Sequence, residues 1–436
     1  MIAVMHGGMN AQAGAMTLDE AVRQAETNAF AVRLQQTVIE KNRQKVNQSQ
    51  GSLGPAISFG ASYLRYDQAV TAQFSSASPP ITIQPIDVKT VNATLTMPID
   101  IAGNMTRLLH ANQASRRSSE LTLNATYNDT RLSVRQAYFS VLRAKAQIVV
   151  DEKALTDAKD RLDQGQKQFD QQQVAKLDVT RYQAQVAQSN SDLISAKDSL
   201  TLANYAFNLA LARPIETAVS LVDMDELPAL TPTEDDLVKA AQTKRPEVLA
   251  AKETLKALAL ITRATESSMN PTLNLQIQSS ETIDPSGFTQ TGAQTTGTLL
   301  LNIPIFDSGV TRAKVKQARQ DETTARINLE QTKLQISQEV RNAIANLSSA
   351  RARLDNATEQ VRLAEEVYRL AKVKQDAGAG TYYEVVDAES QLTLARNGQV
   401  SARYDYLTSY SQLQRAVGQD DLTAAIASTA NGSRGK

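Results

Sequence analysis

Apolar residues recur every seven positions across residues 310–418, where two long segments meet at Asp376-Ala-Gly-Ala-Gly-Thr381. One column of this pattern is Val340, Leu347, Leu354, Val361 and Tyr368, and a second, three residues later, is Ala343, Ala350, Ala357, Ala364 and Ala371. Two such columns are typical of helices that supercoil around one another, and small alanines allow a close approach. The pattern predicts a long helical hairpin, whose returning arm carries Leu392, Gln399, Tyr406 and Leu413 in the same register.

The same hairpin pattern occurs 206 residues earlier, because Val340 and Ala343 correspond to Val134 and Ala137. Two positions of the earlier copy are weaker, Asp151 and Gly165. Further upstream the offset becomes 216, as Thr17 matches Thr233, so we place ten additional residues of the first copy in a loop between about 66 and 90. The sequence therefore predicts two structural repeats, 17–212 and 233–418. A linker would join them at 213–232, and a flexible tail would follow at 419–436.

Alternating apolar and polar residues predict two strands in each repeat. The apolar positions are Ile57, Phe59, Ala61 and Tyr63, then Val91, Ala93, Leu95 and Met97, and in the second repeat Leu273, Leu275 and Ile277, then Leu299, Leu301 and Ile303. A period of two is typical of strands. We expect strands at about 57–66, 90–97, 272–279 and 298–303. One helix would precede them in each repeat, starting near residue 17 or 234, and the hairpin, about 104–212 or about 310–418, would follow.

The predicted strands have one apolar face and one face of Ser, Thr, Asn and Gln. Four strands are too few to close a barrel with a polar interior, and they leave open edges. Two arrangements remain at this stage: hairpins packed on a soluble core, or strands from several chains that share one barrel in lipid, where unpaired backbone groups are not tolerated.

Composition narrows the class of protein. The 436 residues include only 5% aromatics and no tryptophan, which suits long packed helices better than a globular interior. Equal numbers of basic and acidic residues, 46 each, give no reason to expect a nucleic-acid partner. The absence of cysteine excludes disulfides and thiolate sites. No apolar run reaches 18 residues, and residues 1–8 lack the apolar core of a secretory signal, which leaves a cytosolic protein or a removed signal open.

The tandem order of helix, two strands and long helical hairpin, together with specific motifs, resembles the TolC family of outer membrane efflux proteins. The motifs are the Thr17-Leu-Asp-Glu-Ala21 opening, the Pro-Ile joints at Pro98 and Pro304, and the hairpin tip Gly380-Thr-Tyr-Tyr-Glu-Val-Val-Asp-Ala388. The resemblance covers about residues 17–418. It implies a mixed, mainly α fold in which three chains share a 12-stranded transmembrane β-barrel, four strands from each, above a long periplasmic coiled-coil barrel of helices.

The resemblance also implies a function. The protein would be the outer membrane channel-tunnel of a tripartite efflux or type I secretion system, conducting drugs, small molecules or polypeptides passively. It would be a homotrimer in the outer membrane of a Gram-negative-type bacterium, extending into the periplasm. Its partners would be outer membrane lipid, a periplasmic adaptor (membrane fusion) protein and, indirectly, an inner-membrane pump. No cofactor is expected.

Carried over to this sequence, the family's periplasmic gate falls on Glu384 and Asp387, and the corresponding positions of the first repeat carry Asp178 and Arg181. We hypothesise that Arg181 pairs with Glu384 or Asp387 and helps to hold the tip closed. The residues expected to contact the adaptor are Gly378, Gly380 and Thr381 at the second tip, and Val174, Ala175 and Lys176 at the first. The first tip lacks a glycine, which makes docking there less certain.

An enzyme is not expected. His6 and His110, the only histidines, are isolated from each other and from any motif, and Gly378-Ala-Gly380 lacks the lysine and the preceding strand of a phosphate-binding loop. Two alternatives of other classes are a soluble coiled-coil scaffold, which would not explain the strands, and a periplasmic adaptor protein, which usually has a single hairpin. Detergent-dependent extraction would distinguish a channel from both.

Overall fold

A computed structural model describes residues 15–75, 79–224, 227–228, 233–283, 285 and 292–419. His6, most of the loop predicted near residue 285 and the tail from residue 420 lie outside these residues. The chain forms two compact units, each assembled from separate stretches. The hairpin unit comprises Met1–Thr37, Leu121–Leu249 and Gln331–Lys436, and the sheet unit comprises Val38–Glu120 and Ala250–Glu330.

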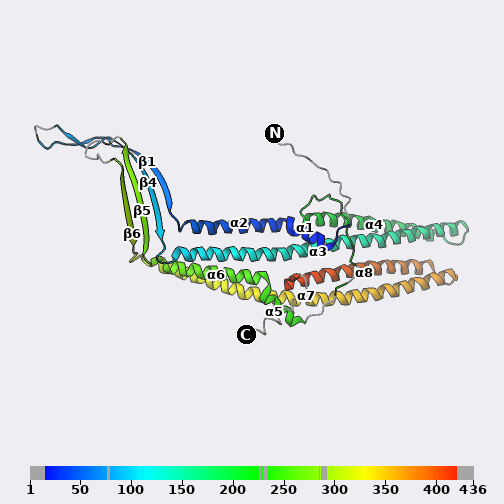
Figure 1. Ribbon diagram of the computed structural model, residues 1–436. Coiled ribbons are helices and arrows are strands. Elements are labelled where there is room, and N and C mark those ends of the chain that lie inside the picture. Colours follow the sequence, from blue (N-terminus) through cyan, green and yellow to red (C-terminus); the bar gives the residue numbers. More distant parts are fainter. Residues whose placement is uncertain are drawn as a thin grey trace. The chain divides into compact units, whose positions relative to one another are not determined.

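The sheet unit is built on four antiparallel strands in the order β1, β4, β5, β6, which lie side by side in Figure 1. Their bounds are Ala56–Arg65 (β1), Asp87–Ile99 (β4), Thr272–Ile283 (β5) and Gln294–Asn302 (β6). Strands β4 and β5 come from different repeats and pair over eleven registered positions, Lys89 to Ile99. The two repeats therefore form one continuous sheet, and β1 and β6 lie at its edges.

Register keeps the two faces of this sheet chemically distinct. Leu95 lies opposite both Ile57 and Ile277, and Leu275 lies opposite both Met97 and Leu299. The polar face is aligned in the same way, with Thr94 opposite Ser58 and Gln278 opposite Thr94 and Thr296. The apolar face is left open, since Ile57 is 76% and Leu299 is 63% exposed. An apolar face of this extent marks a surface that contacts lipid or protein.

The ten additional residues of the first repeat form part of a separate two-stranded ribbon that the sequence did not predict. Its strands are β2 (Val70–Ala72) and β3 (Ile81–Gln84), which pair antiparallel with an irregularity between Val70 and Thr71. The ribbon extends the β1–β4 connection. The insertion thus adds a second, smaller sheet instead of an irregular loop.

Helices of the sheet unit pack through small residues. The buried positions include Ala111 and Ala114 of α3 (Asn104–Asp170), Ala257 and Ala264 of α6 (Pro246–Glu266), and Ala318 and Ala325 of α7 (Val310–Asp376). Thr262 donates a hydrogen bond of 3.2 Å to the backbone oxygen of Ala318, a contact that a larger side chain would block. Alanine therefore fills these contact positions, which allows the helices to approach one another closely.

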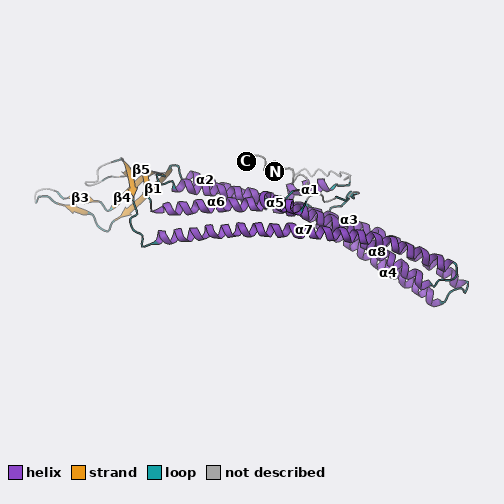
Figure 2. Ribbon diagram, turned by 90° about the horizontal axis from the view of Figure 1, so that it is seen from below, coloured by secondary structure: helices purple, strands orange, loops and turns teal. Residues whose placement is uncertain are grey.

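The hairpin unit contains two antiparallel helical hairpins, each formed by a long helix and a returning helix (Figure 1). Helix α3 is followed by α4 (Lys176–Ala210), and α7 is followed by α8 (Tyr382–Val417). The first three heptads of both predicted columns are buried in α7, and the last two are partly buried. The residues at most 7% exposed are Val340, Ala343, Leu347, Ala350, Leu354 and Ala357. The two turns lie at the same end of the unit in Figure 2.

The single helix predicted before the strands is wrong in both repeats, because each is two helices. Helix α1 (Leu18–Asn28) ends at Ala29 before α2 (Phe30–Gly51), and α5 (Glu234–Lys244) ends at Arg245 before α6. Both break residues have extended backbone, with ψ near 135°: 137° at Ala29 and 133° at Arg245. A residue before proline disfavours the helical conformation, which explains the break before Pro246. Ala29 occupies the equivalent position, 216 residues earlier, without a proline.

The core of the hairpin unit gathers around α3. Tyr138, Val134 and Val141 of this helix are at most 1% exposed and pack with Phe207 and Leu211 at the end of α4. The Tyr138 hydroxyl donates to the backbone oxygen of Met16 at 3.0 Å. The segment after α4 is fixed by Asn208, which is fully buried and donates to the backbone oxygens of Ile215 and Thr217. The start of the inter-repeat segment is therefore anchored to the end of α4, although Ile215 itself is 52% exposed.

Candidate functional site

The two hairpin tips have the same backbone hydrogen bonds despite different sequences. At the second tip Gly378 N donates to Gln375 O at 2.9 Å and Ala379 N donates to Lys374 O at 3.0 Å. At the first tip Gln172 N donates to Phe169 O at 2.8 Å and Gln173 N donates to Gln168 O at 2.9 Å. Each donor and each acceptor at the first tip lies 206 residues before its counterpart at the second tip. Equivalent turns therefore end both long helices.

Gln172 takes the conformation that a glycine takes at the second tip. Its φ is 61°, and φ of Gly378 is 72°, both in the left-handed region that side chains disfavour. The missing glycine thus does not change the turn. The residues expected to contact an adaptor lie at these turns: Gly378, Thr381, Ala175 and Lys176 are exposed, while Val174 and Gly380 are partly covered.

The predicted gate residues occupy the first turns of α4 and α8. Glu384 accepts two hydrogen bonds of 2.9 Å from Nζ of Lys374 across the turn, and these lower the pKa of its carboxyl group. Thr381 caps the same helix, since its Oγ1 accepts from Glu384 N. Asp387 is exposed and forms no ion pair with any described residue.

At the first tip the gate residues pair with each other. Arg181 lies 3.8 Å from Asp178, and Asp178 also accepts a hydrogen bond of 3.3 Å from the backbone N–H of Ala175 at the start of α4. The predicted pairing of Arg181 with Glu384 or Asp387 is therefore not formed within the chain, because a nearer carboxylate on the same helix takes the guanidinium. Asp178 serves as a helix cap, which the sequence pattern did not reveal.

Three residues that the sequence analysis did not select as site residues form a buried ionic cluster near the tips. Arg161 of α3 pairs with Glu389 of α8 and donates a hydrogen bond of 2.6 Å to the hydroxyl of Tyr368 on α7. The exposed fractions of the two charged side chains are only 14% and 9%. Burial raises the pKa of Glu389 to about 7; Asp157 adds to the increase, and Arg161 opposes it. The cluster ties the first hairpin to the second.

Beside this cluster, Tyr182 of α4 and Tyr382 of α8 are in edge contact, with ring centroids 4.0 Å apart. The Tyr182 ring lies against Gly165 of α3, where a Cβ atom would come within 2.3 Å of the ring. Gly165 appeared in the sequence as a weak position of the heptad column. Its departure from the pattern is the signal that could have identified this contact.

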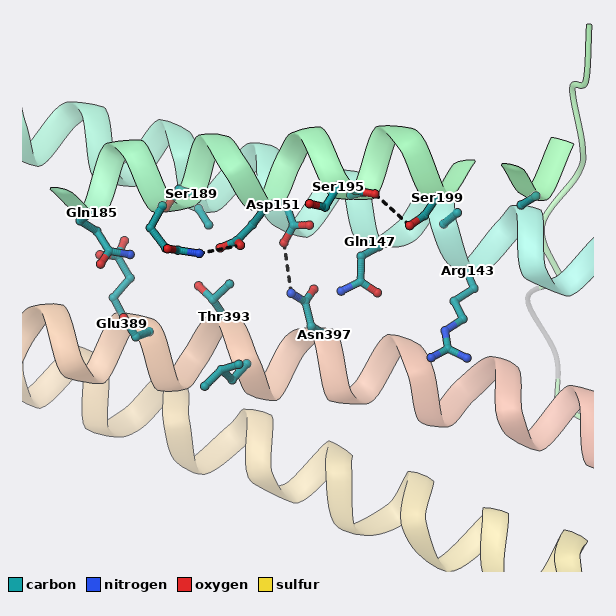
Figure 3. Close-up of a pocket in the computed structure, with 18 of the residues that line it drawn as sticks. Arg143, Gln147, Asp151, Gln185, Ser189, Ser195, Ser199, Glu389, Thr393 and Asn397 are labelled. Atoms are coloured by element: carbon teal, nitrogen blue, oxygen red, sulfur yellow. Dashed lines mark hydrogen bonds between the residues drawn. The ribbon is translucent and has the colours of Figure 1, made fainter. Parts of the chain in front are cut away.

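Asp151 is the other weak heptad position, and it borders a cavity of about 730 Å³ between α3, α4 and α8. Asp151 is 5% exposed and accepts a hydrogen bond of 3.1 Å from Nδ2 of Asn397 (Figure 3). Burial raises the pKa of its carboxyl group. Glu389 lines the same cavity. Its other lining residues are mostly hydroxyl and amide side chains, among them Ser189, Ser195, Gln147, Gln185 and Thr393.

The described residues contain neither a metal site nor a membrane-spanning helix. No group of three or more His, Asp or Glu side chains there is arranged to hold a metal ion. None of the described helices combines the length and the low polarity of a membrane-crossing segment.

The fold and its two surfaces, an open apolar sheet face and exposed hairpin tips, define a class of proteins with known structures. The chain superposes on CusC with a TM-score of 0.80 at 18% identity, covering 94% of this chain and 96% of CusC. It superposes equally well on the outer membrane channel CmeC of Campylobacter jejuni, with a TM-score of 0.80, 18% identity and coverage of 94% and 88%.

Sequence comparison identifies the family. The profile described as outer membrane efflux protein matches residues 21–213 and 237–419. Outer membrane protein TolC of Vibrio cholerae is 26% identical over 69% of this chain and 70% of its own length. The probable efflux pump outer membrane protein TtgC of Pseudomonas putida is 24% identical over 71% of this chain and 63% of its own.

The chain therefore belongs to the outer membrane efflux protein family. The resemblance inferred from its motifs is confirmed, as is the mixed, mainly α fold class with four strands of one sheet per chain. The protein is an efflux channel of the outer membrane that extends into the periplasm. Family membership overturns the two alternatives, a soluble coiled-coil scaffold and a periplasmic adaptor. The family is one of channels, not of enzymes.

Proposed function

We propose that this protein is the trimeric exit duct of a tripartite export assembly, closed at its hairpin tips until an adaptor engages them. The observation that carries the proposal is the four-stranded sheet with one apolar face, one polar face and edges at β1 and β6. In lipid an unpaired edge costs several kcal/mol for each group, so the β1 edge of one chain must pair with the β6 edge of another. Three copies give twelve strands, enough for a barrel with a polar interior.

Engineered disulfides test this trimer. Because the sequence has no cysteine, only the introduced cysteines of this protein can form disulfides. Ser58→Cys on β1 would be combined in turn with Thr296→Cys and Thr298→Cys on β6, which lie on the same polar face. We expect at least one pair to give covalent trimers in outer membranes after oxidation. Ser58→Cys with Leu299→Cys is the matched control, because these side chains lie on opposite faces. Monomers from every pair would overturn the shared barrel.

We propose that the periplasmic gate is formed by Glu384 and Asp387, with Asp178 and Arg181 beside them. Three-fold symmetry would turn each carboxylate into a ring of three, whose mutual repulsion must be compensated in the closed state. Lys374 supplies part of this compensation at Glu384. Asp387 has no ion pair among the described residues, so Arg181 of a neighbouring copy is our candidate for its partner.

Charge reversal tests the lock. In planar bilayers we expect Arg181→Glu to raise the open probability of the channel, because a carboxylate would repel Asp387. Arg362→Glu is a matched reversal on the surface of α7, where Arg362 forms an ion pair with Glu359 on the same helix. Unchanged currents in Arg181→Glu would show that this residue does not hold the gate.

We propose that the adaptor docks on the turn residues Gly378, Gly380 and Thr381 of the second tip and on Val174, Ala175 and Lys176 of the first. The two turns have equivalent backbone hydrogen bonds, which supports docking at both tips, although only the second tip has glycine. Site-specific photo-crosslinkers at Lys176 and at Thr381 are expected to capture the same periplasmic partner in intact cells. Capture at Thr381 alone would restrict docking to the second tip.

A further inference from the structure

The contact between the two repeats inside one chain shows how helices of the sheet unit pack across a repeat boundary. Helix α3 of the first repeat lies along α6 of the second. The Ser118 hydroxyl donates a hydrogen bond of 3.0 Å to the backbone oxygen of Ala250 and lies 2.9 Å from Oγ1 of Thr254. Arg117 lies 3.5 Å from Glu253 in the same contact. The two helices run in opposite directions, because α3 follows β4 and α6 precedes β5.

A second boundary of the same kind is open on both sides of a single chain. In a ring of identical chains the two repeats alternate, so the second repeat of one copy adjoins the first repeat of the next. Helix α7 is the repeat equivalent of α3, and α2 is the repeat equivalent of α6. Within the sheet unit, Figure 2 shows α6 between α2 and α7, which leaves one side of each of these two helices uncovered. The boundary inside the chain therefore predicts that α7 of one copy lies along α2 of the next.

The positions of α2 and α7 that would meet are exposed in the single chain. At the repeat offsets of 206 and 216, Ser118 corresponds to Thr324 and Ala250 corresponds to Leu34. Ala250 is 8% exposed, because α3 of the same chain covers it, whereas Leu34 is 66% exposed. Thr324 is exposed as well. Leu34 thus occupies the place of a buried contact residue without the helix that would cover it.

Exposed apolar residues form a row on each of the two helices. The α2 row is Phe30, Leu34 and Val38, and the α7 row is Ile327 and Leu334. The pair of Arg117 and Glu253 fixes their relative height, because its repeat equivalents are Thr323 and Thr37. With these two threonines level on antiparallel helices, Leu34 lies within one residue of Ile327, and Phe30 lies between Ile327 and Leu334. The two rows can therefore interdigitate and remove each other from water.

The charges beside the rows are complementary. Arg33 of α2 lies three residues after Phe30, and Glu330 of α7 lies three residues after Ile327, so each is turned to the same side of its row. On antiparallel helices these two sides meet. Both residues are exposed, and neither forms an ion pair with a described residue. A contact between α2 and α7 would bring the guanidinium to the carboxylate and favour this pairing of helices over others.

We propose that the α2 row of one copy packs against the α7 row of the next copy, and that Arg33 of the first pairs with Glu330 of the second. A second copy is the occupant because a repeat of this same chain already fills the equivalent place inside one chain. The inference rests on the proposed trimer and extends it from the edges of the sheet to a helical contact with named residues.

Paired substitutions test whether the two rows meet. Leu34→Asp and Ile327→Arg are each expected to lower the temperature at which the trimer dissociates in detergent by about 5 °C or more. The double variant should recover at least half of this loss, because the new charges can pair across the contact. Val149→Asp is the matched control, since the repeat equivalent of this exposed valine is Asp355, an exposed carboxylate. Single variants that dissociate as wild type does, or a double variant without recovery, would overturn the contact.

Disulfides separate this contact from the shared barrel. Leu34→Cys would be combined in turn with Thr324→Cys and Ile327→Cys, and we expect at least one pair to give covalent trimers in outer membranes after oxidation. Leu34→Cys with Arg326→Cys is the control, because residue 326 is exposed at the same height but turned by about 100° from Ile327; it should give monomers.

The outcome is compared with that of the cysteine pairs between β1 and β6. Trimers from the strand pairs, but only monomers from both helix pairs, would overturn the contact of α2 with α7 and leave the shared barrel intact. Monomers from the strand pairs and from the helix pairs would overturn both proposals. Rows covered by the chain's own ends instead of a second copy would also give monomers from the helix pairs.

Discussion

The two helical hairpins share one heptad pattern and equivalent turns, yet they differ at the positions where they meet each other. Gly165 and Tyr182 of the first hairpin correspond to Ala371 and Ala388 of the second, and Arg161 corresponds to Val367. Val367 is 55% exposed, whereas the side chain of Arg161 is 14% exposed. Each hairpin can follow the same internal pattern, but a contact between them uses different faces of the two copies. Departures from the repeat therefore mark the contacts that join the hairpins.

The largest effect is expected from breaking the buried ion pair. Arg161→Met leaves Glu389 buried without its cation, which typically costs about 3–5 kcal/mol of the free energy of unfolding. The raised pKa of Glu389, about 7, means that its folded form holds a proton more readily than the unfolded chain. Its favourable contribution to stability is therefore present at low pH and is lost as the pH rises through about 7.

We accordingly expect Arg161→Met to be much less stable than wild type at pH 8 and closer to it at pH 5, as measured by thermal unfolding in detergent. Val367→Met, the equivalent position of the second hairpin, is the control and should change little at either pH. Equal destabilisation by Arg161→Met at both pH values would show that the charge of Glu389 is not the cause.

A smaller effect is expected at Gly165. Gly165→Ala installs the residue that the second hairpin has at this position, but its Cβ would lie 2.3 Å from the Tyr182 ring. Overpacking of this kind costs about 1–3 kcal/mol, which outweighs the helix propensity of about 1 kcal/mol that alanine gains over glycine. Denaturant unfolding should therefore show a net loss of stability.

The sign of this effect should reverse when the ring is removed. In a Tyr182→Ala background, which reproduces Ala388, we expect Gly165→Ala to increase stability, since only the helix propensity remains. A loss of stability in both backgrounds would refute the contact with Tyr182 as the reason for the glycine.

The smallest effect is expected at the turns. Gln172→Gly should stabilise the first tip by about 1 kcal/mol, because glycine adopts the left-handed conformation without the steric penalty. Gly378→Gln should destabilise the second tip by a similar amount. Hydrogen exchange of the tip amides would report both changes. Stabilisation by both substitutions, or destabilisation by both, would be inconsistent with equivalent turns.

The sequence predicts the helices and strands whose repeating pattern extends over many residues. It does not predict features that a single residue decides. The columns through Val340 and Ala343 extend over five heptads, and the alternation at Ile57 to Tyr63 has no other simple explanation, so the helices and strands were predictable. The break at Ala29 was not, because nothing in its local sequence opposes a helix. The ribbon of β2 and β3 depends on short-range pairing without a clear alternating pattern.

The candidate sites differ in the signal that they leave in the sequence. Motifs at the second tip pointed to Glu384 and Asp387, because they rest on a contiguous resemblance. The contact of Arg161 with Glu389 joins residues more than 200 positions apart. A periodic pattern shows which face of a helix is apolar, but it does not show which polar face of one hairpin packs against the other hairpin. Asp151 and Gly165 were visible as weak heptad positions, so their signal was present as an exception to the pattern.

The most direct test of the central claim, that this protein is a gated outer membrane channel, is the electrical current through purified protein in planar lipid bilayers. We predict brief and infrequent steps of current, because the tips are closed for most of the time without an adaptor. These steps should prefer cations, and the preference should be reduced in the Glu384→Gln, Asp387→Asn variant because its tip carboxylates are neutral. Bilayers that remain silent with both proteins, under conditions in which the protein inserts, would contradict the account.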